Sequence, residues 1–327
     1  MNIVITGASG FVGGHLVRSL ALQHSVTSIS RRKIPEANKY RWIATDITKK
    51  YTIPKGTDVV VHVAAVADLQ ADAETAYEVN VVGTKNTIKA AEDAGVAHFI
   101  FISTASVYDA SKNKHRVSEN FTKVSEANNE YAKTKYQAEQ LVEQSTLQST
   151  ILRPHVIYGS CDTSILPGIF ENIRGKFLPL PISKSKEVST TFIGNLCSVV
   201  SQIIERQPTD NAIYNLADEG YIENIEFIQR LIDMLGNVSI LAVSPLLIKA
   251  ILRVFPLLKI DARTIDQLNE DSSLDISNIL NDTYILPYTR DSGLADLANW
   301  YSVSTSYSKA RAQTNEVWPG YKDSLIY

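Results

Sequence analysis

Three evenly spaced glycines follow the first apolar run of the chain. The run from Asn2 to Thr6 is typical of a buried strand, and apolar residues recur at helical spacing from position 12 to Leu20. Between the two stand Gly7, Gly10 and Gly13. Without a strand before them and a helix after them, these glycines would indicate only a tight turn. In this context they let the backbone approach a pyrophosphate at the positive end of a helix dipole, which predicts a dinucleotide-binding unit.

Strands and helices continue to alternate over the first half of the chain. Further apolar runs are separated by segments of helical periodicity, and they lie at 25–30, 41–44, 58–63, 98–103 and 150–153. This order predicts an α/β fold, a doubly wound parallel (Rossmann) sheet with helices on both faces. We assign 1–154 to the dinucleotide-binding domain, with a return near 188–216, and 155–327 mainly to a smaller substrate-binding part. Such sheets bind ligands at the carboxyl ends of their strands.

Two segments of this half carry more specific expectations. The helix after 58–63 should end at Gly95. Its buried face is expected to carry Tyr77, Val81, Ile88 and Ala91. The polar stretch 109–129 is the longest loop-like insertion, and loops of that length are commonly functional lids.

Tyr131 and Lys135 stand one helical turn apart in a predicted helix that runs to about Ser145. An ammonium group near a phenol favours the phenolate, which brings the pKa of a tyrosine down from about 10 towards a range useful for acid–base catalysis. The same spacing also arises by chance on ordinary amphipathic helices. Beside a dinucleotide loop, the pair predicts hydride chemistry.

The end of the second strand distinguishes between the two nicotinamide cofactors. An acidic residue there would bond the ribose 2′-hydroxyl of NAD, whereas this chain has Arg31 and Arg32, which suit the 2′-phosphate of NADP. NADP is therefore expected, with NAD as the alternative cofactor and a solvated basic turn as the structural alternative. Asp46, after the third strand, is expected either to accept a bond from the adenine amino group or to cap a turn.

Composition excludes several classes of function. The 327 residues carry 32 basic and 35 acidic side chains, a net charge of -3, so no nucleic-acid surface is expected. The only two cysteines, Cys161 and Cys197, lack the spacing of metal ligands, so we expect no metal and a reducing cytoplasm. No cleavable leader is predicted at the amino terminus. A homodimer remains open.

The most apolar stretch, 240–258, is interrupted by charges and prolines, so it does not predict a membrane-spanning helix of about 20 residues. Ser244 and Pro245 are typical of a helix start. The expected apolar face of this helix consists of Leu246, Leu247, Ala250, Ile251 and Val254. Core packing is the first interpretation of that face, and peripheral membrane contact or a substrate wall are the alternatives.

A series of motifs resembles the extended short-chain dehydrogenase/reductase superfamily, that is, the NAD-dependent epimerase/dehydratase family. The match covers about 1–235, and later segments are similar to its 3β-hydroxysteroid dehydrogenase-like branch. The motifs, in order, are Thr6–Gly13, Asp46, His62–Ala65, Asn80 with Gly83–Thr84, Ser103–Tyr108, Tyr131–Lys135, Leu152–Pro154 and Tyr158–Gly159.

The resemblance implies roles for individual residues. Tyr131 would exchange a proton with the substrate oxygen, Lys135 would lower its pKa and hold the nicotinamide ribose, and Thr104 would hydrogen-bond the same oxygen. The bottom-up chemistry agrees, because a carbonyl that accepts hydride develops negative charge on its oxygen. The cofactor-binding residues implied are Gly7, Ser9, Gly10, Phe11, Val12, Gly13, Arg31, Arg32, Asp46, Ile47, Ala64, Ala65, Lys135 and Pro154.

Departures from the family pattern limit what the resemblance implies. Asp109 and Ser160–Cys161 replace residues common in the family, so the substrate loops differ. Ala105 and Ser106 stand where sugar-nucleotide dehydratases carry carboxylates, which disfavours dehydration. His62, in a valine-rich strand, is expected to be buried and neutral. The remaining pocket candidates, with a structural role as the alternative, are His155, Cys161 and Asp162.

Three functional hypotheses follow. We favour an NADP(H)-dependent oxidoreductase that acts on a carbonyl or secondary alcohol of a hydrophobic, steroid-like or β-hydroxy acyl substrate. The apolar surface expected to accept that substrate is the helix after Pro245 with Ile165, Leu166, Ile169 and Phe170. The alternatives are a nucleotide-sugar epimerase or 4-keto reductase and, more remotely, a non-catalytic NADP-sensing protein.

Overall fold

A seven-stranded parallel sheet forms the centre of the computed structural model, in the order β12-β7-β5-β4-β1-β2-β3. The structure describes residues 1–32, 40–67, 72–126, 128–162, 165–234, 236, 238–254, 265–266 and 268–303. The strands are β1 (Asn2–Thr6), β2 (Ser25–Ser30), β3 (Arg41–Ala44), β4 (Val59–His62), β5 (His98–Ile102), β7 (Ser149–Pro154) and β12 (Ala212–Leu216). The order reverses between β1 and β4, where a doubly wound sheet binds its ligand. The predicted Rossmann architecture is confirmed.

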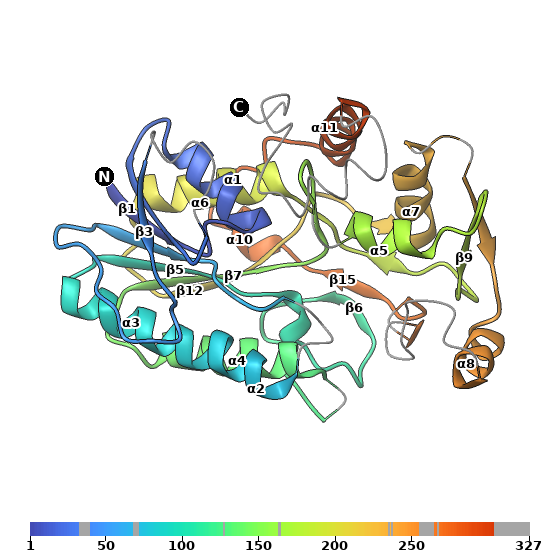
Figure 1. Cartoon of the computed structure of the whole chain (residues 1–327), viewed down its shortest axis with the longest axis horizontal. Helices are drawn as coiled ribbons and strands as arrows, with labels where there is room; N and C mark the ends of the chain where they lie inside the picture. The colour runs from blue at the N-terminus through green and yellow to red at the C-terminus, as the bar shows by residue number, and fades with distance from the viewer. Residues whose placement is uncertain are drawn as a thin grey trace.

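Helices cover both faces of this sheet (Figure 1). The helices α1 (Phe11–Leu20) and α6 (Ile193–Arg206) pack together on one face, and α3 (Gly83–Ala94) and α4 (Glu130–Glu143) pack together on the other. Each helix buries an apolar stripe against the sheet, and the central strands β4 and β5 between the two layers are apolar apart from one histidine each. Because β12 belongs to the same sheet, the chain returns to the first domain within 188–216.

A π-helical turn that the sequence did not reveal joins α3 to the helix before it. Helix α2 (Ala73–Tyr77) continues through the π turn Glu78–Val82 into α3, which ends at Gly95 in the left-handed conformation, as predicted. The wider turn changes the angular spacing of side chains, so the predicted face is wrong at Tyr77, which is 47% exposed, whereas Val81 is buried.

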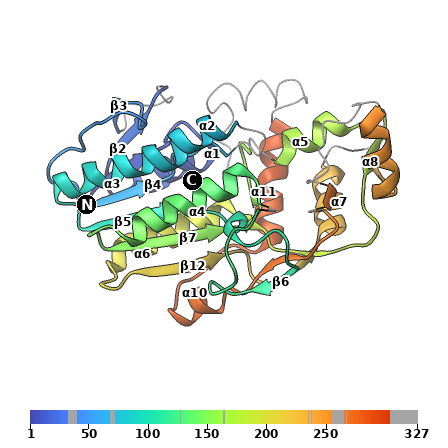
Figure 2. The same ribbon diagram turned by 90° about the horizontal axis from the view of Figure 1, so that it is seen from below.

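A second, smaller part of the molecule extends beyond the carboxyl ends of the strands (Figure 2). Its four-stranded sheet has the order β13-β10-β15-β6. These strands are β6 (Lys114–Val117), β10 (Glu187–Val188), β13 (Ile222–Glu223) and β15 (Ser272–Leu274). Short strand pairs accompany it: β8 (Ile157–Tyr158) with β11 (Thr191–Phe192), and β9 (Phe177–Leu180) with β14 (Ser239–Ala242). The remaining helices are α5 (Ile165–Asn172), α7 (Asn224–Asp233), α8 (Pro245–Val254), α10 (Ser277–Asn281) and α11 (Arg290–Val303), of which α10 packs against β12 of the larger sheet.

Strand β6 corrects the prediction that 109–129 is a loop-like insertion. The strand lies inside that segment and pairs in parallel with β15, more than 150 positions further along the chain. Asn128 adds a second attachment, because its side-chain amide donates to the Ser106 and Tyr108 carbonyls at 3.1 and 2.8 Å. The segment is therefore part of the wall between the two sheets rather than a free lid.

Helix α8 begins at Pro245 as predicted, but its buried face is not the predicted one. Leu246 and Leu247 are 79% and 54% exposed, whereas Ile248 is buried. The side chains of Ala250, Ile251 and Val254 lie outside the described residues. Within the part of the chain that the structure describes, no helix is long and apolar enough to cross a membrane.

Candidate active site

The glycine loop is closed so tightly that only glycine fits at two of its positions. Gly7 has a φ of +70°, and a Cβ there would lie 2.6 Å from the Ala64 nitrogen. A Cβ on Gly13 would lie 2.2 Å from the Gly7 carbonyl oxygen. Gly10 precedes α1 in extended conformation and brings no side chain to the amino end of the helix. The bare backbone at that positive helix end fits the pyrophosphate of a dinucleotide.

The other predicted residues of this region lie around the loop. Phe11 and Val12 open α1 and are partly buried against the core, and Ser9 is half-buried in the loop itself. Ala64 and Ala65 follow β4 and are half-buried beside Gly7. Pro154 ends β7, where it is buried and pairs with Leu216 of β12. The order of the strands in the sheet, not their order in the sequence, brings these positions to the same edge of the sheet.

His62 fixes the loop after β4 and carries no charge. Thr84 donates its hydroxyl proton to the Asn80 carbonyl at 2.6 Å, so it accepts from Nε2 of His62 at 3.0 Å. Nδ1 of His62 therefore accepts from the Thr6 hydroxyl at 2.6 Å. That hydroxyl oxygen in turn accepts from the Ala64 backbone N–H at 3.3 Å. Burial lowers the pKa of His62 to about 3, as expected for a neutral structural histidine.

The arginines at the end of β2 are both exposed to solvent. Across from them, the Asp46 carboxylate accepts from the backbone N–H and the hydroxyl of Thr48 at 3.0 and 2.9 Å. These bonds, with a smaller contribution from the nearby Arg31 charge, lower the pKa of Asp46. Asp46 thus caps a turn, which was the second of its two predicted roles. Ile47 is buried where a Cβ on Gly83 would touch it.

The predicted catalytic residues meet where β5 ends and α4 begins. Thr104 follows β5 and caps the 3₁₀ turn Ala105–Val107, while Asn129 caps α4 by accepting from the Ala132 N–H at 2.9 Å. The Thr104 hydroxyl lies close enough to the Tyr131 phenol to oppose the rise that burial causes in its pKa. Two hydroxyl groups are therefore side by side at a strand end, although they are far apart in the sequence.

The expected effect of Lys135 on Tyr131 is not seen. Burial raises the pKa of Tyr131, and the opposing influence comes from the Thr104 hydrogen bond. The Lys135 ammonium instead donates to the Ile102 carbonyl at 2.8 Å and lies 4.0 Å from the centre of the Phe101 ring. Lys135 is 2% exposed, and this burial lowers its own pKa to about 7. The ammonium is held against the end of β5 and is only partly protonated near neutral pH.

A buried polar network that sequence reasoning missed supports this helix. Glu139 lies one turn after Lys135 and forms a bidentate ion pair with Arg153, at 2.9 Å from Nε and 2.7 Å from Nη2. The same guanidinium donates to the Glu119 carbonyl at 3.0 Å and to the Tyr108 hydroxyl at 3.3 Å. The Glu119 carboxylate accepts from the Asn215 N–H at 2.8 Å. The spacing of Tyr131, Lys135 and Glu139, four residues apart in one helix, was the sequence signal that pointed to a buried charge beside Lys135.

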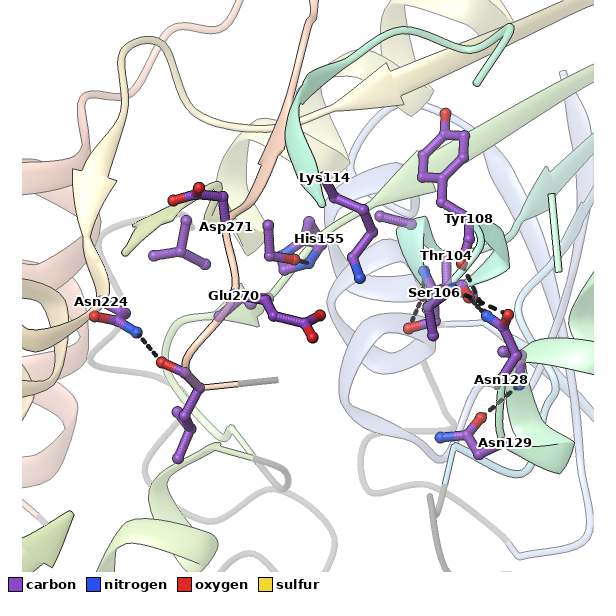
Figure 3. Close-up of a pocket in the computed structure, with 17 residues that line it drawn as sticks. Thr104, Ser106, Tyr108, Lys114, Asn128, Asn129, His155, Asn224, Glu270 and Asp271 are labelled. Atoms are coloured by element: carbon purple, nitrogen blue, oxygen red, sulfur yellow. Dashed lines mark hydrogen bonds between the residues drawn. The ribbon is translucent and has the colours of Figure 1, made fainter. Parts of the chain in front are cut away.

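A cavity of about 290 Å³ opens between the two parts of the molecule, and Thr104 lines it. In Figure 3, Thr104, Ser106 and Asn129 occupy one wall, and His155, Glu270 and Asp271 occupy the other. The cavity wall is thus rich in polar and charged side chains. Val156 lines the cavity with a φ of +38°, a strained value for a β-branched residue and one that clusters at functional sites.

The apolar wall predicted for the substrate is wrong where the structure describes it. Leu166 is buried in the main hydrophobic cluster, Ile165 and Ile169 pack against that cluster, and Leu246 and Leu247 face solvent. The Phe170 side chain lies outside the described residues. The helix faces were assigned from periodicity alone, which does not specify what covers each face.

Of the three pocket candidates, only His155 lines this cavity. Its Nδ1 donates to the Ser189 carbonyl at 2.9 Å and its Nε2 accepts from the Ser272 hydroxyl at 2.6 Å, while burial lowers its pKa to about 4. Asp162 is buried and accepts from the backbone N–H of Ile165 at 3.1 Å, at the start of α5. Cys161 is buried in the core, and burial raises its pKa to about 12.

Comparison with known proteins identifies the family. The profile of the NAD dependent epimerase/dehydratase family matches residues 3–217. The chain belongs to this family. It is therefore an enzyme of the extended short-chain dehydrogenase/reductase type, as the motifs predicted.

Relatives within this family differ in the activity that their names record. The chain is 32% identical over 214 residues to a 3-beta-hydroxysteroid dehydrogenase of Mycolicibacterium neoaurum, covering 60% of this chain and 58% of that protein. It is 30% identical over 256 residues to a UDP-glucose 4-epimerase of Vibrio cholerae, covering 70% of this chain and 74% of the epimerase.

Solved structures confirm the fold. UDP-glucuronic acid 4-epimerase from Bacillus cereus, in complex with NAD, superposes with a TM-score of 0.73 at 19% identity, over 94% of this chain and 98% of that one. At this identity the likeness concerns the fold alone.

Proposed function

We propose that this epimerase/dehydratase family member is an NADP(H)-dependent oxidoreductase that interconverts a carbonyl and a secondary alcohol. The observation that carries the proposal is the closeness of the Thr104 hydroxyl to the Tyr131 phenol, with Thr104 on the cavity wall and the buried Lys135 one turn after Tyr131 on α4. A non-catalytic NADP-sensing protein would have no use for that combination.

The residues present fit a dinucleotide. Gly7 and Gly13 leave a space that a Cβ would fill, and the amino end of α1 faces it. Arg31 and Arg32 are exposed at the end of β2, where their guanidinium groups are free to pair with a 2′-phosphate. This is why we favour NADP over NAD.

The protein side of the reaction concerns one oxygen atom. When bound, the nicotinamide supplies or accepts the hydride. Tyr131 donates its phenolic proton to the oxygen that becomes an alkoxide. Thr104 turns its hydroxyl away from Ser106, to which it otherwise donates at 3.2 Å, and donates a hydrogen bond to the same oxygen. The raised pKa of Tyr131 keeps the phenol protonated and ready to donate. Lys135 would hold the nicotinamide ribose, as the family resemblance implies, and would release its bond to the Ile102 carbonyl to do so.

A second candidate function is a nucleotide-sugar epimerase or 4-keto reductase. It is favoured by the polar and charged side chains of the cavity wall, such as Asn129 and Glu270, which suit the hydroxyl groups of a sugar better than an apolar skeleton. The epimerase would need the same hydroxyl pair but would return the hydride to the bound sugar.

The test is a panel of substrates with both nicotinamide cofactors, followed through the absorbance of the reduced nicotinamide. An oxidoreductase consumes NADPH in a one-to-one ratio with reduced ketone. The panel includes UDP-glucose and UDP-N-acetylglucosamine with their products separated by chromatography. Efficient epimerisation of either sugar without net cofactor turnover, together with no reaction on ketones, would replace the proposal by the second candidate.

A further inference from the structure

Lys114 brings an ammonium group to the cavity that Thr104 also lines. The residue opens β6, where its backbone N–H donates to the Asp271 carbonyl at 3.3 Å and fixes it beside β15. Figure 3 shows its side chain reaching into the pocket, between the wall with Glu270 and His155 and the wall with Thr104 and Ser106. Among the described residues, no hydrogen bond or ion pair engages its ammonium group.

The neighbouring charges do not neutralise this ammonium. Asp271 is engaged by Lys186 at 3.7 Å, by the Glu187 N–H at 3.1 Å and by the Asn113 side chain. His155 is neutral, so it offers no countercharge. Glu270 and Asp109 act on Lys114 from a distance and favour its charged form, but burial outweighs them and lowers its pKa. The positive charge therefore lacks a close partner.

Further donors converge on the same space. The Asn129 carbonyl oxygen is used to cap α4, which leaves its amide N–H groups to face the cavity. The Ser106 hydroxyl oxygen accepts from Thr104 at 3.2 Å and retains its own proton for donation. A group that accepts several hydrogen bonds and carries negative charge would satisfy all of these donors.

We propose that Lys114 recognises an anionic oxygen group, a carboxylate or a phosphate, that the substrate carries near its reacting carbonyl. The inference rests on the proposed oxidoreductase function and narrows its substrate class. Glu270, on the same side of the cavity, disfavours an anion by repulsion and so limits which anions are accepted. The second wall thus selects substrates by charge.

The experiment compares three ketones with the same alkyl chain and different end groups, two anionic and one neutral: 3-oxooctanoate, 3-oxooctyl phosphate and the methyl ester of 3-oxooctanoate. We expect the wild-type enzyme to have a higher kcat/KM for one of the anions than for the ester. The preferred anion shows whether Lys114 recognises a carboxylate or a phosphate. Lys114→Met should lower kcat/KM for that anion by about 10- to 100-fold and leave the ester unchanged. Lys114→Arg should restore part of the loss, and Glu270→Gln should raise kcat/KM for the anion.

The matched control is Lys112→Met. Lys112 lies two residues earlier, is half exposed and donates to the Thr122 hydroxyl at 2.9 Å, outside the cavity wall. This variant should behave as wild type with all three ketones. Melting temperatures of all variants check that they are folded.

Several outcomes would overturn the inference while the proposed function stands. These are equal losses for anion and ester in Lys114→Met, or wild-type turnover of the ester at least as efficient as that of both anions. If none of the ketones is reduced, the proposed function fails for this panel. The role of Lys114 is then tested by calorimetry, which measures the binding of 3-hydroxyoctanoate and of 3-hydroxyoctyl phosphate to the protein with NADP⁺. Binding of either anion that is lost in Lys114→Met but kept in Lys112→Met supports its role. Binding of neither anion, or binding that is unchanged in Lys114→Met, refutes it.

Discussion

The two walls of the cavity are built in different ways. The wall on the side of the seven-stranded sheet is held by backbone and buried groups: the glycine loop, the neutral His62 and the ion pair between Arg153 and Glu139. The opposite wall consists of short strands of two to four residues that present Lys114, Glu270 and Asp271. The first wall leaves almost no freedom for substitution, whereas the second presents half-buried charged side chains to the cavity. The comparison indicates that the first wall positions the groups that transfer the proton, and that the second wall determines which substrates bind.

The comparison predicts the largest effect for the hydroxyl pair of the first wall. Tyr131→Phe removes the proton donor but keeps the ring, so turnover should fall by about 10²- to 10⁴-fold. Cofactor affinity, measured by fluorescence titration, should change little. Tyr136→Phe, five residues further along the same helix, is the control and should retain activity. A fully active Tyr131→Phe enzyme would show that Tyr131 is not the proton donor.

The next largest effect concerns the network that holds α4. Arg153→Met leaves the buried Glu139 carboxylate without its partner, which should lower the free energy of unfolding by about 3 to 5 kcal/mol in denaturant titrations. Lys89→Met, which breaks the exposed pair with Asp93, should leave stability nearly unchanged. If the two variants lost equal stability, the network would have no special part in fixing the first wall.

A smaller effect is expected for the cofactor arginines. The double variant Arg31→Ala with Arg32→Ala should weaken NADPH binding by about 10- to 100-fold, because charge-assisted bonds to the 2′-phosphate are lost. NADH binding should stay within experimental error, and Arg41→Ala on β3 serves as the control. Equal losses for both cofactors, or tighter binding of NADH by the wild type, would contradict the NADP assignment.

The smallest effect is a dependence of stability on pH. His15, His62, His98 and His155 are buried, and their pKa values are lowered from 6.5 to about 3 or 4. Between these values and 6.5 the unfolded chain binds more protons than the folded one, so stability rises with pH across this window and is lost as the pH falls through it. His98→Gln should flatten this dependence, and His115→Gln, at a half-exposed position, should not. Parallel curves for all proteins would show that the buried histidines do not govern acid unfolding.

Local requirements explain which features were predictable from the sequence. Strands β1, β2 and β3 have the predicted bounds, and the glycine loop and Gly95 were recognised, because each depends on a few neighbouring residues. The juxtaposition of Thr104 and Tyr131 required the family resemblance.

The features that were missed depend on distant partners. Strand β6 pairs with β15, and Glu119 contacts Asn215, 96 positions away. The lowered pKa values of Lys114 and Lys135 arise from burial that no local pattern encodes. The face of α8 was wrong at Leu246 and Leu247 for the same reason, since periodicity gives a stripe but not the surface that covers it.

The most direct test of the account follows a deuteride label. NADPH deuterated at its transferable position is incubated with the enzyme and the ketone panel, and the products are analysed by mass spectrometry. The account predicts an alcohol with deuterium on the former carbonyl carbon, formed in equal amount to NADP⁺, and a loss of both products in Tyr131→Phe. Epimerised nucleotide sugar with no deuterium and no net consumption of NADPH, together with unreacted ketones, would contradict it.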